Sequence, residues 1–153
     1  MKVLLLILSV IAFSGCNAQN KENTNKQTAN TEISKNLRQL EMLERRASHT
    51  STLLNDGRVL IAGGFQSNAG ETTILNSAEI YDPSTGEFTK TGNLNERRVS
   101  QNAVLLPDGR VLLIGGWEVG RRSSLLEVYD PETEEFIVVG NLPSPRDGTT
   151  STL

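Results

Sequence analysis

The only histidine of the chain lies among hydroxyl side chains and is the first candidate for catalysis. Ser48 and Ser51 flank His49, and a serine beside a histidine can form a nucleophile with its general base. A longer pattern repeats along the chain, however, and the positions equivalent to His49 hold Gln101 and Thr149. Because neither residue can act as that base, we interpret position 49 as a structural position of the repeat.

A nine-residue motif occurs twice in the chain, and each copy ends in two adjacent glycines. Residues 56–64 read DGRVLIAGG and residues 108–116 read DGRVLLIGG. A glycine-rich loop holds phosphate where it leads into a helix, but no helix pattern follows either copy. We therefore expect these glycines to adopt positive φ and to let neighbouring backbones approach closely. They are Gly63, Gly64, Gly115 and Gly116.

Composition excludes several classes of function. The 153 residues carry a formal net charge of -3 and a sequence pI of about 5.2, so we expect no basic surface for a nucleic acid. One cysteine and one histidine can form neither an intramolecular disulfide nor a cysteine- or histidine-rich metal site. We accordingly predict no nucleic-acid partner, no metal and no cofactor.

The chain from about residue 37 is built on a period near fifty. SAEIYDPSTGEF at 77–88 recurs as LLEVYDPETEEF at 125–136, and RASHTSTL at 46–53 recurs as RDGTTSTL at 146–153. A period of this length is typical of a repeat architecture. Each unit contains four short strand signals separated by turn residues, at 49–54, 58–64, 78–81 and 88–92 in the first unit. Four antiparallel strands per unit predict an all-β fold made of propeller blades.

A helix over residues 33–45 is the competing prediction, because Ile33, Leu37 and Leu40 follow helical spacing. In the repeat, residues 42–46 align with 94–98 and with 142–146, and the last of these segments holds two prolines. A helix interior does not accept them. We therefore predict a connector at 42–46, and upstream of it both alternatives stand.

The glycine pairs, the two tyrosines that follow them and the phrases DGRVL and AEIYDP resemble kelch repeats, as in bacterial kelch proteins and galactose oxidase-like propellers. The resemblance covers about residues 40–153 and implies two blades and the first strand of a third. Phe88 and Phe136 stand where kelch repeats commonly have tryptophan. Because such a ring is incomplete, we expect a fragment or a truncated chain. The alternatives are a non-functional remnant of a truncated gene and self-association through the unclosed blades.

Most repeated residues are expected to have structural roles. The rings of Tyr81 and Tyr129 are predicted to lie between blades, with their hydroxyls bonded to the backbone. The recurring arginines and glutamates are predicted to form partly buried ion pairs, with solvated charges at blade edges as the alternative. These residues are Arg46, Arg98, Arg146, Glu79 and Glu127.

The first 36 residues differ in composition from the repeats. Lys2 precedes an apolar run from Val3 to Phe13, which is too short to span a bilayer and is typical of a secretory signal. The ending FSGC resembles the lipobox of bacterial lipoproteins, which implies cleavage after Gly15 and lipidation of Cys16. We therefore predict a signal peptide at 1–15, lipidated Cys16 with a flexible polar tether at 16–36, and export to the bacterial cell envelope, on its periplasmic or surface face.

The connection between the second and third strands is the part that does not repeat. Glu79 follows Gly64 by 15 positions, but Glu127 follows Gly116 by only 11, and the tight turns belong to the opposite face. Unrepeated loops are the better candidates for ligand recognition; the alternative is that the aromatic residues pack between blades and the arginines are solvated. The candidates are Phe65, Gln66, Asn68, Trp117, Glu118, Arg121 and Arg122.

These observations favour a membrane-anchored kelch-repeat module that binds a protein or a glycan and catalyses no reaction. The alternative is a fragment of a carbohydrate-active kelch enzyme, such as a sugar epimerase or oxidase, whose catalytic residues lie in other blades. Copper chemistry of the galactose oxidase type would need histidine ligands and a cysteine–tyrosine crosslink. One histidine, and one cysteine within the lipobox, do not supply them.

Overall fold

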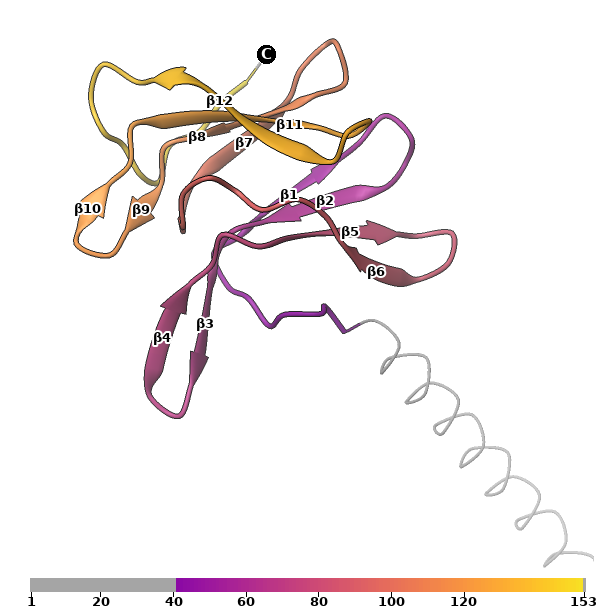
Figure 1. The fold of residues 1–153 in the computed structure, drawn as a ribbon, viewed down its shortest axis with the longest axis horizontal. Coiled ribbons are helices and arrows are strands. Elements are labelled where there is room, and N and C mark those ends of the chain that lie inside the picture. Colours follow the sequence, from indigo (N-terminus) through magenta and orange to yellow (C-terminus); the bar gives the residue numbers. More distant parts are fainter. Residues whose placement is uncertain (1–40, 153) are drawn as a thin grey trace, which may run out of the picture. The chain divides into compact units, whose positions relative to one another are not determined.

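The computed structural model describes residues 41–152 (Figure 1). The described residues belong to one compact unit of the chain. The predicted signal peptide, Cys16, the tether and the helical alternative upstream of residue 41 lie outside the described residues. No helix long and apolar enough to cross a membrane is found among residues 41–152.

Residues 41–152 form strands and their connections, in agreement with the all-β prediction. Residues 42–46 contain no helix and form a connector, as the repeat alignment predicted. The strands among the described residues are β1 (Thr50–Leu53), β2 (Val59–Ala62), β3 (Phe65–Asn68), β4 (Glu71–Ile74), β5 (Ala78–Asp82), β6 (Glu87–Lys90), β7 (Asn102–Leu105), β8 (Val111–Ile114), β9 (Trp117–Glu118), β10 (Arg121–Arg122), β11 (Leu125–Asp130) and β12 (Glu135–Asn141).

Two antiparallel four-stranded sheets repeat the same arrangement. Blade 1 has the strand order β1-β2-β5-β6 and blade 2 the order β7-β8-β11-β12 from inner to outer strand. The register is the same in both: Leu60 lies opposite Ile80, and its equivalent Leu112 lies opposite Val128. The inner strands β1 and β7 contact each other. The blade prediction is therefore confirmed, and the described residues form part of a propeller ring.

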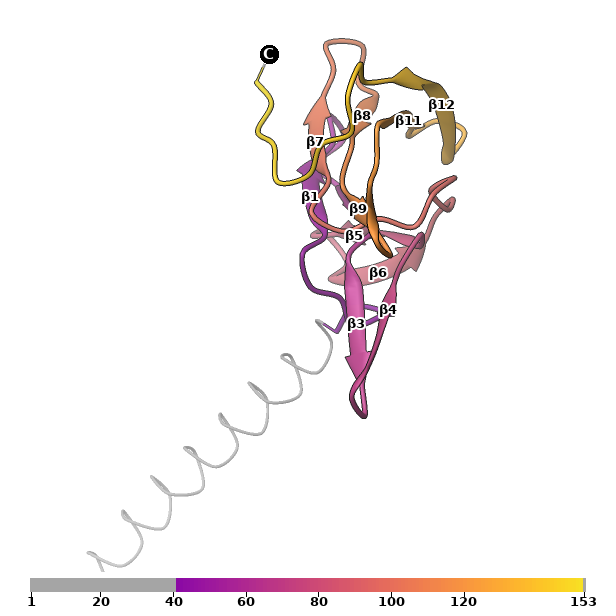
Figure 2. The same ribbon diagram turned by 90° about the vertical axis from the view of Figure 1, so that its left-hand side faces the viewer.

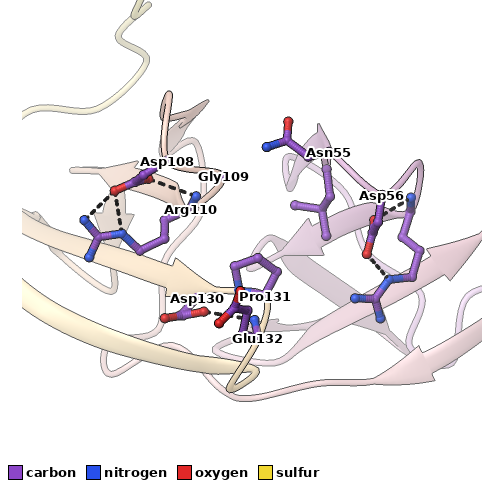
Figure 3. Close-up of a pocket in the computed structure, with 10 residues that line it drawn as sticks. Asn55, Asp56, Asp108, Gly109, Arg110, Asp130, Pro131 and Glu132 are labelled. Atoms are coloured by element: carbon purple, nitrogen blue, oxygen red, sulfur yellow. Dashed lines mark hydrogen bonds and ion pairs between the residues drawn. The ribbon is translucent and has the colours of Figure 1, made fainter.

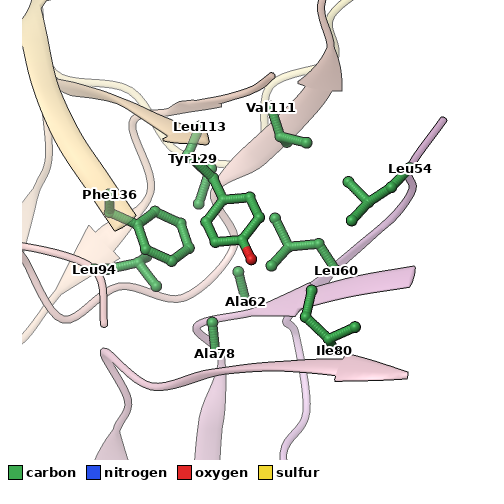
Figure 4. Packing of buried hydrophobic residues seen from close by; sticks show 10 residues of the cluster. All are labelled: Leu54, Leu60, Ala62, Ala78, Ile80, Leu94, Val111, Leu113, Tyr129 and Phe136. Atoms are coloured by element: carbon green, nitrogen blue, oxygen red, sulfur yellow. The ribbon is translucent and has the colours of Figure 1, made fainter. Parts of the chain in front are cut away.

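The hydrophobic core lies between the two blades (Figure 4). Side chains from β2 and β5 of blade 1 face side chains from β8, β11 and β12 of blade 2. Burial of each large apolar side chain contributes about 1.5–3 kcal/mol, so this interface stabilises the pair of blades. The buried cluster comprises Leu54, Leu60, Ala62, Ala78, Ile80, Leu94, Val111, Leu113, Tyr129 and Phe136.

The two repeated tyrosines differ in their surroundings. Tyr129 is fully buried between the blades, as predicted, but its hydroxyl lies 2.8 Å from the Thr91 side-chain hydroxyl. The prediction of a backbone partner was therefore wrong for Tyr129, because blade 1 places a threonine side chain opposite its ring. Tyr81 is half-buried and packs on Phe88, with ring centroids 4.7 Å apart.

The predicted pairing of arginine with glutamate is present in both blades. In blade 1, Arg46 Nη2 lies 2.6 Å from Glu79 Oε1, while Nη1 donates to the carbonyls of Gly63 and Ser77, at 2.9 Å each. The second oxygen of Glu79 accepts the backbone N–H of Leu43 at 2.8 Å. One ion pair thus ties the connector, the glycine pair and the third strand of the blade together.

Blade 2 repeats this arrangement with complete burial of both charges. Arg98 pairs with Glu127 and donates through Nη1 to the carbonyls of Gly115 and Leu125, at 3.0 and 3.1 Å. Glu127 Oε2 accepts the backbone N–H of Asn95 at 2.8 Å. Both side chains are 0% exposed; the pairs are thus more deeply buried than predicted. Burial lowers the pKa of Arg98 from its ordinary value, although the charges of Glu127 and Glu96 raise it.

Two segments differ from their predicted structure. The connections after β2 and β8 were predicted as loops, but each folds into a two-stranded hairpin, β3–β4 and β9–β10. Residues 149–152 were predicted as an inner strand and form no strand. A counterpart of β2, which would pair with them, is absent from the described residues.

Candidate functional site

The candidate binding residues lie on the two hairpins that interrupt the repeat. Figures 1 and 2 show β3–β4 and β9–β10 projecting from the blades, away from the tight turn between β1 and β2. An isolated bridge joins each hairpin to the connector of its blade, Ala47 to Phe65 and Val99 to Trp117. Both hairpins therefore start from equivalent positions and then differ in sequence.

In the first hairpin, β3–β4, only the tip is exposed. Phe65 is half-buried and lies opposite Ile74, which is buried. Gln66 is also half-buried, and Asn68 is exposed beside the turn. The turn residues Ala69 and Gly70 have φ of 50° and 89°, the combination that a type I′ hairpin turn requires. Phe65 is therefore less exposed than the tip of this hairpin.

In the second hairpin, β9–β10, an aromatic ring and a guanidinium lie side by side. Trp117 is 38% exposed, and it is paired across the strands with Arg122, so the two side chains share one face of the hairpin. This face opens into a depression of about 570 Å³, lined by Trp117, Gly120, Arg121, Arg122, Pro145 and Asp147. The depression combines an apolar wall with charged groups of both signs.

Arg121 lies opposite Glu118 and is held by carboxylates. It forms ion pairs with Glu96 and, at 2.5 Å, with Glu118. Burial alone would raise the pKa of Glu96, but the Ser123 hydroxyl and the Arg121 charge outweigh it and hold that pKa below its ordinary value. The hydrogen bond to Glu96 raises the pKa of Arg121. These contacts join the hairpin to Glu96, which precedes Arg98 in the same blade.

Two residues of the depression were missed in the sequence. Asp147 accepts a hydrogen bond from Nε of Arg122 at 2.5 Å, and Pro145 forms part of the wall. Asp147 occupies the position that holds Ala47 and Val99 in the two earlier repeats. The comparison of repeats that singled out the two unrepeated connections therefore contained a signal for Asp147 as well.

The seven candidate residues do not form a single site. None of Phe65, Gln66 and Asn68 lines the depression beside Trp117, and Glu118 points to the Arg121 side of its hairpin. The structure places Trp117, Arg121 and Arg122 around one depression and leaves the first hairpin separate from it. The sequence singled out the segments that form these two hairpins, but it could not show which face of each hairpin the side chains occupy.

A second pocket, of about 480 Å³, lies among the tight turns (Figure 3). Its charged groups are satisfied locally: Asp56 Oδ2 is 2.7 Å from Arg58 Nε, and Asp108 Oδ2 is 2.6 Å from Arg110 Nη2. Hydrogen bonds from Arg58 and Arg110 lower the pKa of Asp56 and of Asp108. Because these residues recur in both blades, this pocket reflects the architecture of the repeat. It serves as a control region for the site beside Trp117.

The surroundings of His49 among the described residues do not match those of a catalytic base. Its Nδ1 atom is buried and has no hydrogen-bond partner within residues 41–152. Burial, followed by the charge of Arg46, lowers the pKa of the His49 imidazole. The same residues contain no group of three or more histidine, cysteine, aspartate or glutamate side chains that could hold a metal ion.

Comparison with protein families gives a match that covers both blades. Residues 46–95 and 98–143 each match the model described as the kelch motif. Together these segments make up more than half of the chain. Their boundaries contain the repeated glycine pairs and the Arg–Glu pairs described above.

Curated relatives and solved structures agree with this match. Kelch repeat and BTB domain-containing protein 1 of cowpox virus (strain GRI-90 / Grishak) and that of vaccinia virus (strain Copenhagen) are each 33% identical over 69 residues. The match covers 45% of this chain and 12% of the length of each viral protein. The structure of YjhT aligns with a TM-score of 0.57 and 18% identity, over 64% of this chain and 38% of that one. This likeness shows the propeller fold.

Proposed function

Because the chain belongs to the kelch-repeat family, we propose that it is a binding module that catalyses no reaction and holds a protein partner on the β9–β10 hairpin. The observation that carries this proposal is the exposed pair of Trp117 and Arg122 at the edge of the depression. Tryptophan and arginine are the residue types most enriched among the dominant contacts of protein interfaces. Both occur here in a segment that the other blade does not repeat.

The chemistry of the depression indicates what the partner presents. The Trp117 ring provides a flat apolar surface, and the Arg122 guanidinium donates to Asp147 through Nε, so its two Nη groups can still bind a ligand. A planar guanidinium suits a carboxylate, which it can bind with two parallel hydrogen bonds. We therefore infer a peptide segment with an apolar side chain next to an aspartate or a glutamate.

Replacing Trp117 and Arg122 by alanine together is expected to weaken partner binding at least about 30-fold, since a single dominant contact already contributes about 2 kcal/mol or more. The measurement is chemical cross-linking of the full chain in cells that make it, followed by mass spectrometry. The matched control replaces Asp108 and Arg110 on the opposite face. In that control variant the cross-linked adduct between the chain and its partner is expected to persist. An adduct that survives in the Trp117/Arg122 variant, with unchanged circular dichroism, would contradict the proposal.

A glycan is the second candidate partner, and the exposed ring of Trp117 favours it because an aromatic face can stack on a sugar ring. The two candidates differ in what Arg122→Lys should do. A bidentate contact with a carboxylate is lost in Arg122→Lys, whereas stacking of a neutral sugar on Trp117 is retained. Retained binding in Arg122→Lys together with lost binding in Trp117→Ala would favour the glycan.

We also propose that the module is tethered to the bacterial cell envelope through Cys16. The support is the sequence FSGC after an apolar run and the polar segment that follows it. Cys16→Ala is expected to abolish incorporation of an alkyne-labelled fatty acid, since this is the only cysteine of the chain, and to release the protein from the membrane fraction. Ser14→Ala, which keeps a small residue before the cysteine, should retain the label. A labelled Cys16→Ala protein would contradict the anchor.

A further inference from the structure

The β9–β10 hairpin depends on the rest of blade 2 for its orientation. Its strands pair at only two positions, whereas β3 and β4 pair at four. An isolated two-stranded hairpin is at best marginally stable in water. Its turn residues, Val119 and Gly120, are exposed, and so are both residues of β10. The contacts that this hairpin makes with the connector of its own blade therefore decide how it presents Trp117 and Arg122.

Glu96, in that connector, binds the hairpin through both of its carboxylate oxygens. Arg121 Nη2 donates to Oε1, and the Ser123 hydroxyl donates to Oε2. Arg121 belongs to β10, and Ser123, which is buried, follows that strand directly. The side chain of Glu96 is 14% exposed, and neither Glu96 nor Ser123 lines the depression beside Trp117. Glu96 therefore holds the hairpin without forming part of the surface that a ligand would contact.

The contacts continue from Glu96 into the interior of blade 2. Glu96 Oε2 lies 3.7 Å from Arg98 Nη2, and Arg98 pairs with Glu127, where both side chains are 0% exposed. The pKa of Glu96 lies below its ordinary value, so this carboxylate is charged at neutral pH. On the side of the hairpin, Arg121 Nη2 lies 2.5 Å from Glu118 Oε2. Charges of alternating sign thus run from the exposed hairpin to a fully buried ion pair, with Glu96 at the centre.

Blade 1 has the same glutamate without its contact to a hairpin. Glu44 stands at the position of Glu96, two residues before the buried arginine of its blade. Its Oε2 atom lies 3.3 Å from Arg46 Nη2 and accepts a hydrogen bond from the Ser77 hydroxyl. Ser77 directly precedes β5 and belongs to no hairpin. Among the described residues, Glu44 makes no hydrogen bond or ion pair with β3 or β4. The repeated position therefore has an additional role in blade 2.

A single residue at the end of each hairpin explains this difference. The N–H of Leu75, after β4, donates to the carbonyl of Gly64 at 2.8 Å. The N–H of Ser123, after β10, donates in the same way to the carbonyl of Gly116 at 2.7 Å. A leucine side chain offers no donor to a carboxylate, whereas a serine hydroxyl does. The unrepeated connection therefore supplies the donor that joins the repeated glutamate to the β9–β10 hairpin.

We propose that Glu96 is the positioning residue of the candidate binding site and holds the β9–β10 hairpin in the orientation that presents Trp117 and Arg122. The inference rests on the proposed function for its consequence, since only a hairpin that binds a partner gains affinity from being held. A hairpin that is ordered before the partner arrives avoids the conformational entropy that binding would otherwise cost. Loss of the Glu96 contacts therefore weakens partner binding although every group that touches the partner remains.

Hydrogen–deuterium exchange of the full chain without a partner, read by mass spectrometry, measures this positioning directly. In Glu96→Gln the amides of residues 117–123 are expected to exchange at least about 10-fold faster, because charge-assisted hydrogen bonds to the hairpin are lost. The amides of β8 and β11 report the stability of the blade as a whole and are expected to accelerate far less. Equal acceleration in the hairpin and in these two strands would overturn the positioning role.

The matched control is Glu44→Gln, which replaces the equivalent glutamate and also loses contacts with an arginine and a serine. Residues 117–123 should exchange in this variant as they do in the unmodified chain. Ser123→Ala removes one of the two hairpin contacts of Glu96 and keeps the buried ion pair, so the same amides should accelerate by a smaller factor. Unchanged exchange of residues 117–123 in Glu96→Gln, or equal acceleration in Glu44→Gln, would overturn the proposal.

Cross-linking of the same variants in cells separates this inference from the proposed function. The yield of the partner adduct is expected to fall in Glu96→Gln and to persist in Glu44→Gln. Faster hairpin exchange in Glu96→Gln with an undiminished adduct would overturn the role of Glu96 in binding. An adduct that survives in the Trp117/Arg122 variant contradicts the proposed function, whereas the exchange measurement, made without a partner, decides separately whether Glu96 holds the hairpin.

Discussion

Replacing Arg98 by methionine is expected to lower the free energy of unfolding by about 3–5 kcal/mol. Both Arg98 and its partner Glu127 are 0% exposed, so the substitution leaves a carboxylate inside the protein without its counter-charge. It also removes the donors to the carbonyls of Gly115 and Leu125. A buried acceptor that loses its donor costs about 1–3 kcal/mol. The methionine fills much of the volume, so the loss reports charge and hydrogen bonding more than packing.

The measurement is urea-induced unfolding of the full chain at one fixed protein concentration, since association would make the midpoint depend on concentration. The matched control is Arg110→Met, which breaks the ion pair with Asp108 on the surface. Both of these side chains are nearly half exposed, and such a pair contributes about 0–1 kcal/mol. Equal losses in the two variants would contradict the structural role of the buried pair.

The double variant Arg98→Met/Glu127→Met separates the pair from the burial of a lone charge. Removing both charges abolishes the unpaired carboxylate, so the double variant is expected to be more stable than Arg98→Met alone. The backbone N–H of Asn95, which Glu127 accepts, remains without its acceptor. For that reason the double variant should not regain the full stability of the unmodified chain.

The repeat explains why these pairs could be predicted before their contacts were known. Arg46 and Arg98, like Glu79 and Glu127, recur at fixed positions among apolar residues. A charge that returns at the same place in each unit has the same surroundings in each unit, so a shared partner is expected. The sequence also contained Asn-Asp-Gly and the Gly-Gly pairs, whose turn and backbone requirements are local. Strand order and blade architecture followed from these.

The features that the sequence did not predict depend on contacts that cannot be inferred from the repeat pattern. The β3–β4 hairpin was predicted as a loop because FQSNAGETTI shows little apolar alternation, and its pairing depends on the turn at Ala69 and Gly70. The partner of the Tyr129 hydroxyl was mispredicted because Thr91 belongs to the other blade. The depression beside Trp117 depends on how residues 145–147 pack against a hairpin formed earlier in the chain. Such contacts are set by the tertiary structure.

Gly64→Ala is expected to destabilise the chain by about 2–5 kcal/mol, from backbone conformation and steric contact together. Gly64 has φ of 93°, and an added Cβ would lie 2.6 Å from the carbonyl oxygen of Ala47. That oxygen accepts the N–H of Phe65 at 2.9 Å, and the N–H of Gly64 donates to the carbonyl of Arg98 at 2.9 Å. The methyl group would therefore push apart the connector and the strand end that the adjacent hydrogen bonds hold together.

Gly70→Ala separates the two contributions, because Gly70 has φ of 89° and no atom lies within 4 Å of the position of an added Cβ. That variant bears the conformational cost alone, about 1–2 kcal/mol. Urea-induced unfolding of both variants at one protein concentration gives the difference that belongs to the close approach. If Gly64→Ala costs no more than Gly70→Ala, the connector can move away from the glycine pair at no cost. The Gly-Gly signature would then reflect backbone conformation alone, without the close packing between connector and blade.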